Sequence, residues 1–177
     1  MHVVTPTVKE LLASPERSAA ALTHRWGAAA LLHLPDSEQM NRALLKWGAV
    51  STSFVAPNSR RAMERSLLML RAFTEMQLRF LPETEPARVI LGRGPESDVQ
   101  FNDATVSKHH ATLVSSSEGF VLHDEGSMNG TTLNSVSLIG DTLLHDGDVI
   151  GLGEFNLLFV GSKTLFLQLE SVRRSAA

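Results

Sequence analysis

The first 74 residues carry the marks of short helices. Thr7 and Glu10 have the spacing of a capping box, in which each side chain satisfies a backbone N–H at the start of a helix. Ser14 followed by Pro15 supplies an N-cap and a first-turn proline. Helices are predicted where an N-cap residue precedes apolar positions at helical spacing, over residues 14–33, 36–48 and 59–73. We expect a small helical N-terminal region.

From residue 75 the apolar positions change to a period of two. Met76, Leu78 and Phe80 alternate with polar residues, which is typical of a half-buried strand. Short apolar runs then recur between Gly, Asn, Asp and Ser residues, at 87–91, 98–101, 110–114, 119–123, 131–133, 149–151 and 155–160. Runs of this length and spacing predict an antiparallel β-sandwich or barrel. Residues 164–169 could form a last strand or a short helix, and periodicity does not decide between them.

Composition narrows the class of protein. The chain has 177 residues, of which 43% are hydrophobic, and it has no Cys, which excludes disulfides and Cys-ligated metals. Its formal net charge is −3 and its C-terminal half is the more acidic one, so we expect no nucleic-acid partner. No apolar run approaches the length that spans a bilayer, and residues 1–6 lack the layout of a signal peptide. We expect a soluble, cytoplasmic protein.

Four polar clusters lie in loops between the predicted strands, namely Gly92-Arg93, Ser107-Lys108-His109-His110, residues 124–131 and residues 146–153. The ordered series Gly-Arg, Ser-x-x-His, Asn-Gly-Thr and Gly-Asp-x-Ile-x-Leu-Gly resembles a forkhead-associated (FHA) domain over about residues 75–161. The resemblance implies an FHA-like β-sandwich that binds phosphothreonine peptides through its apical loops. The expected fold class is therefore α+β, with a helical region (1–74), an antiparallel β-sandwich (75–161) and a C-terminal extension (162–177).

The side chains of these loops suit a phosphate ester and an extended peptide. Arg93 at a strand end offers a rigid fork to two phosphate oxygens, Ser107 offers a hydroxyl donor, and Lys108 adds a mobile charge. Asn129 carries donors and an acceptor and can pair with a peptide backbone. The resemblance implies that Arg93, Ser107 and Lys108 hold the phosphate, while Asn129 holds the peptide main chain.

Other positions support this site or depart from the family pattern. The resemblance implies that Gly92 and His110 are architectural, with His110 bracing the loops from behind. We assign Gly130 and Thr131 to the same supporting role, because a glycine permits the turn that the loop requires. Met128, which we include among the binding residues, stands where the family often has a small polar side chain. Its presence removes a hydroxyl from the phosphate side, although we still expect a competent site.

The sequence lacks part of the residue set required for a calcium-binding loop, for a histidine metal site and for a serine nucleophile. Residues 146–157 imitate a calcium-binding loop but place Ile150 at a ligand position. His109 and His110 are adjacent, so on a strand they would point to opposite faces, and no further ligand completes a metal site. Ser107 lies outside any Gly-x-Ser-x-Gly elbow. We expect no metal, no cofactor and no enzymatic activity.

We therefore expect a phosphothreonine-binding adaptor whose partner is phosphorylated by an upstream Ser/Thr protein kinase. An alternative is a phosphorylation-independent assembly or oligomerisation scaffold, and a homodimer paired through the helical segments also stays open. A third hypothesis is autoregulation. Thr5 and Thr7 lie in what we expect to be a flexible N-terminus, so that either residue, once phosphorylated, could bind to the chain's own loops.

Overall fold

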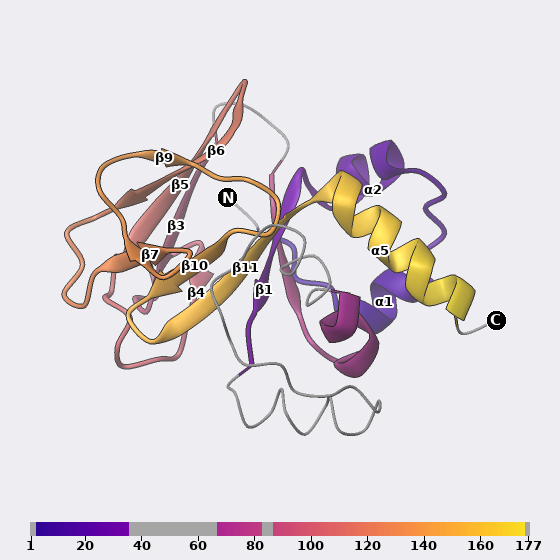
Figure 1. The fold of residues 1–177 in the computed structure, drawn as a ribbon, viewed down its shortest axis with the longest axis horizontal. Helices are drawn as coiled ribbons and strands as arrows, with labels where there is room; N and C mark the ends of the chain where they lie inside the picture. The colour runs from indigo at the N-terminus through magenta and orange to yellow at the C-terminus, as the bar shows by residue number, and fades with distance from the viewer. Residues whose placement is uncertain (1–2, 36–66, 83–86, 176–177) are drawn as a thin grey trace.

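Two sheets packed face to face form the body of the molecule, and helices cover one of them (Figure 1). The structure is a computed structural model and describes residues 3–35, 67–82 and 87–175. The strands are β1 (Ala29–His33), β2 (Leu78–Leu81), β3 (Arg88–Gly92), β4 (Val99–Gln100), β5 (Ala111–Ser116), β6 (Gly119–Asp124), β7 (Thr131–Leu133), β8 (Val136–Ser137), β9 (Thr142–Leu143), β10 (Val149–Leu152) and β11 (Phe155–Gly161). The predicted α+β class with an antiparallel β-sandwich is confirmed.

The two sheets differ in size and share one core. The first has six strands in the order β2-β1-β11-β10-β7-β8, and the second has five in the order β4-β3-β5-β6-β9. The pair β3–β4 is parallel. Leu113 on β5 lies opposite Leu122 on β6, and both are fully buried between the sheets with Leu91 and Leu31. Apolar burial at these alternating positions fixes the register, because a slip by one residue would turn each of them to the opposite face.

A layer of helices covers the outer face of the first sheet. It contains α1 (Val8–Ala13), α2 (Ala19–Trp26) and α5 (Ser162–Ser175), and residues 67–72 are also helical. Leu11 and Leu22 pack there with Leu165 and Leu169 in a second core that also takes in Phe80 of β2. None of the helices in these three described stretches is both long and apolar enough to cross a membrane.

The helix predicted for residues 14–33 is wrong at both ends. Ser14 is the C-cap of α1, and α2 begins only after Ser18, whose side chain accepts from the N–H of Ala21. The helix ends at Gly27, and Ala29–His33 forms β1 in the first sheet. Leu31 faces the sandwich core, whereas the neighbouring residues of β1 face the helical core, so the strand is buried on both sides and shows no period of two.

The structure also tests the predictions made for the two ends of the chain. The capping box of Thr7 and Glu10 is confirmed at the start of α1. The expectation of a flexible N-terminus is wrong for residues 3–7, because the N–H groups of Leu78 and Phe80 donate to the Pro6 and Val4 carbonyls, both at 2.9 Å. At the other end, the segment that could be strand or helix is helical, within α5. The helix predicted over residues 36–48 lies outside the described residues, as does the first part, 59–66, of the helix predicted over 59–73, whose residues 67–72 are helical.

Candidate functional site

Three loops at one end of the sandwich are joined by hydrogen bonds. They follow β3, connect β4 to β5, and connect β6 to β7. The backbone N–H of Arg93 donates to the Ser107 carbonyl at 2.8 Å. The N–H of Met128 donates to Ser107 Oγ at 3.0 Å, and Asn129 Nδ2 donates to the carbonyl of Thr105 at 2.8 Å. The structure thus brings Arg93, Ser107 and Asn129 onto one rim, although they are far apart in the sequence.

The cationic side chains of this rim are exposed. Arg93 Nε donates to the Val106 carbonyl at 3.1 Å, which fixes the plane of the guanidinium. Within the described stretches of chain, its two Nη atoms and the Lys108 ammonium have no hydrogen-bond or ion-pair partner. The Lys108 backbone is held in place, because its carbonyl accepts from the N–H of Gly94 at 3.0 Å and from Ser97 Oγ at 2.9 Å. Both positive charges therefore face solvent from an ordered backbone.

The neutral side chains of Ser107 and Asn129 are also each oriented by one hydrogen bond within the protein. Ser107 Oγ accepts from Met128, so its own hydroxyl hydrogen is available to another acceptor. Asn129 uses its Nδ2 group on Thr105, which leaves the Oδ1 atom to accept from a ligand. Each of these side chains is thus oriented by the protein and keeps hydrogen-bonding capacity for something outside it.

His110 lies behind the rim and is fully buried. Its Nδ1 accepts from the N–H of Ser107 at 3.0 Å, so the ring proton is on Nε2, which contacts the Gly130 carbonyl at 3.2 Å. Burial lowers the pKa of His110, and the Gly130 hydrogen bond opposes that effect only in part. The side chain is thus a neutral brace between two loops. Gly92 belongs to this support too, because a Cβ atom there would overlap the Lys108 carbonyl.

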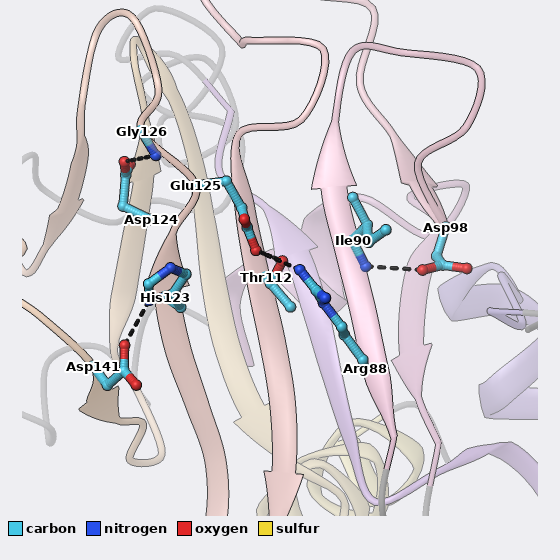
Figure 2. A network of polar contacts seen from close by, with 9 residues as sticks. All are labelled: Arg88, Ile90, Asp98, Thr112, His123, Asp124, Glu125, Gly126 and Asp141. Carbon is cyan, nitrogen blue, oxygen red and sulfur yellow. Dashed lines mark hydrogen bonds and ion pairs between the residues drawn. The ribbon is translucent and has the colours of Figure 1, made fainter.

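Asp124 holds the β6–β7 loop in place. The sequence pattern alone did not predict it as a site residue. Asp124 accepts from the N–H of Gly126 at 2.8 Å (Figure 2). It accepts from the N–H and the Oγ of Ser127 at 2.9 and 2.8 Å. It also accepts from Thr131 Oγ1, which gives that buried threonine a supporting role. Burial alone would raise the pKa of Asp124, but these hydrogen bonds outweigh it and lower the pKa. An Asp two residues before a glycine is a turn signal.

Thr105 is the second residue that motif reading missed. Its hydroxyl donates to Asp103 Oδ1 at 2.6 Å and accepts from the N–H of Glu154 at 3.1 Å. Its carbonyl accepts from Asn129. Thr105 therefore links the β4–β5 loop, the β6–β7 loop and the turn between β10 and β11.

A polar network stiffens the outer face of the second sheet next to the rim. Figure 2 shows Arg88 on β3 paired with Glu125 at 2.8 Å, and Thr112 on β5 bonded to the same carboxylate. The Thr112 hydrogen bond is the main reason that the pKa of Glu125 is lowered. His123 pairs with Asp141 at 2.6 Å, which raises the pKa of His123. These contacts tie neighbouring strands together just below the loops.

Comparisons with known proteins agree with this fold. The FHA domain family model matches residues 89–153. The chain is 38% identical over 81 residues to an ABC transporter ATP-binding/permease protein of Mycobacterium tuberculosis, a match that covers 46% of this chain and 9% of that protein. It is 35% identical over 99 residues to an oxoglutarate dehydrogenase inhibitor of Corynebacterium jeikeium, covering 55% of this chain and 67% of that protein.

A solved structure has the same fold. The FHA domain of the CT664 protein from Chlamydia trachomatis matches with a TM-score of 0.50 at 17% identity, covering 76% of this chain and 97% of that one. The chain described here belongs to the FHA-domain family. FHA domains are binding modules for phosphothreonine peptides rather than enzymes.

Proposed function

We propose that this protein is a phosphothreonine-peptide-binding adaptor that acts downstream of a Ser/Thr protein kinase. The observation that carries the proposal is the rim itself. Arg93, Ser107 and Asn129 are each fixed by one hydrogen bond and keep their remaining polar atoms for a ligand. Such preorganisation lowers the entropy that a ligand must overcome on binding.

In this proposal the phosphate sits among Arg93, Ser107 and Lys108. The two Nη groups of Arg93 donate to two phosphate oxygens, a paired charge-assisted arrangement that is stronger and more specific than neutral hydrogen bonds. Ser107 donates its hydroxyl hydrogen to a third oxygen, and Lys108 adds a second positive charge from a flexible side chain. No carboxylate is assigned to the phosphate itself, since the nearby Asp124 is occupied by the groups that hold its loop.

Asn129 binds the peptide main chain in the same arrangement. Its Oδ1 atom accepts a backbone N–H of the ligand, while its Nδ2 group stays on Thr105. A contact of this kind recognises an extended backbone and leaves the choice of side chains to other residues.

We place the phosphothreonine on a partner protein. Thr5 and Thr7 are less suited, because their segment is paired with β2, and because Thr7 Oγ1 donates to Glu10 Oε2 at 3.0 Å. A phosphorylated Thr5 or Thr7 would have to detach from β2 before it could bind to the rim.

Selection from a phosphothreonine-peptide library tests the proposal on the full chain. We expect enrichment of specific phosphopeptides and at least a tenfold loss of affinity with Arg93→Ala, because the guanidinium supplies the paired charge-assisted bonds. Arg17→Ala, which removes an exposed arginine between α1 and α2, is the matched control and should bind as the wild type does.

A pull-down separates this function from the scaffold alternative. The wild type and an Arg93→Ala, Ser107→Ala double variant are used to capture partners before and after phosphatase treatment. Loss of the same partners in both cases supports phosphate-dependent binding. Unchanged capture by the double variant would support a phosphorylation-independent scaffold and overturn the proposal.

A further inference from the structure

Met128 is one of the two most exposed large apolar residues in the described part of the chain. Its exposed fraction is 91%, equal to that of Ile139 and well above the 68% of Val136. The side chain contributes to neither core. Single exposed apolar side chains are common on protein surfaces, so the position of Met128 in the β6–β7 loop of the rim carries the argument, and its exposure makes it accessible to a ligand.

The backbone of Met128 is fixed to the phosphate side of the rim. Its N–H donates to Ser107 Oγ at 3.0 Å. The residue before it, Ser127, is bonded through both N–H and hydroxyl to Asp124. The residue after it, Asn129, is bonded to Thr105. Because both neighbours are anchored, the backbone of Met128 is held in place, and its exposed side chain belongs to a residue that is bonded to Ser107 and precedes Asn129.

We propose that Met128 is a specificity-determining residue, which selects phosphothreonine peptides with an aliphatic or aromatic side chain close to the phosphothreonine. This inference rests on the proposed function. A ligand whose phosphate lies on Ser107 and whose backbone lies on Asn129 passes the Met128 side chain. Contact with an apolar ligand residue removes apolar surface of both partners from water. The unbranched thioether adapts to side chains of different shape, so the class of residue is selected rather than one residue.

The test uses peptides that contain one phosphothreonine flanked by Ser and Gly, in which each of three positions on either side is replaced in turn by Leu. Affinities are measured for the wild type, Met128→Ser, Met128→Leu and a control, Val136→Ser, which removes an exposed apolar residue on β8. We expect Leu at one or more positions to raise wild-type affinity about three- to tenfold. Met128→Ser should lose this gain, whereas Met128→Leu and Val136→Ser should keep it.

The outcomes separate this inference from the function on which it rests. If the wild type binds the phosphopeptides no better than their unphosphorylated forms, the proposed function fails. If binding depends on phosphate but no Leu position raises affinity, the inference about Met128 is overturned and the function stands. The same conclusion follows if Met128→Ser retains the whole gain.

Discussion

Asn129 Nδ2 donates to the carbonyl of Thr105 at 2.8 Å, across 24 residues of chain. This bond aligns the carboxamide and joins two of the three loops of the rim. Neither residue is buried, so the bond contributes more to the direction of the Asn129 side chain than to folding.

Substitution of Asn129 should therefore lower affinity far more than stability. We expect Asn129→Ala to weaken phosphothreonine-peptide binding about tenfold and to change the free energy of unfolding by less than about 1 kcal/mol. Calorimetry and urea denaturation measure the two effects. Asn102→Ala, an exposed asparagine in the loop after β4, is the control. A large loss of stability with unchanged affinity would assign Asn129 to the fold instead of the site.

Asp124→Asn should loosen the β6–β7 loop. The new amide presents donors to Ser127 and Thr131, which already donate, so we expect a loss of about 1–3 kcal/mol in the free energy of unfolding and weaker peptide binding. Because the pKa of Asp124 is lowered, its contribution is present above its ordinary pKa of 3.8 and is lost as pH falls below it. Asp141→Asn, at an exposed ion pair, is the control. Equal losses in both variants would contradict a special role for Asp124.

His110 should make stability fall in mild acid. Its pKa is lowered by burial, so the unfolded chain binds the proton more tightly, and stability decreases as pH drops through its ordinary pKa of 6.5. His123 has a raised pKa and acts in the opposite direction. We expect His110→Gln to reduce the loss of stability between about pH 7 and pH 5, and His123→Gln to increase it. Thermal unfolding at several pH values checks both signs, and the same slope in both variants would contradict the account.

Arg173 on α5 should matter for stability and not for binding. Its guanidinium donates to the carbonyl oxygens of Leu11, Leu12 and Ser14, at 2.6, 3.0 and 3.1 Å, and so closes the end of α1. We expect Arg173→Ala to lower the free energy of unfolding by about 2–4 kcal/mol, since several carbonyls lose a charged donor together. Arg174→Ala, next to it and exposed, should have little effect. Loss of phosphopeptide affinity in folded Arg173→Ala would show coupling between the helical layer and the rim.

The main residues of the site were easier to predict from the sequence than the fold around them. Arg93, Ser107 and Asn129 lie in loops, where their order and spacing carry the signal, and the structure brings them together. The sequence did not indicate the roles of Asp124 and Thr105, because each depends on which loops meet in space. A polar residue in a turn looks the same whether it caps its own turn or joins two loops.

The strand β1 was missed for a physical reason. Its Ala29–His33 segment lies between the sandwich core and the helical layer, so nearly all of its residues are buried and no alternation marks it as a strand. A short apolar run of this kind following a helical pattern reads as the end of the helix. The feature that separates them is Gly27, whose φ of 142° ends α2 and lets the chain pass close to Leu81.

The most direct test of the central claim is a calorimetric titration of the full chain with one library-selected peptide in two forms, phosphorylated and unphosphorylated at its threonine. The account predicts saturable binding of the phosphorylated form and affinity at least about 100-fold weaker for the other, since Arg93, Ser107 and Lys108 would then lose their ligand. Equal affinity for the two forms would contradict it.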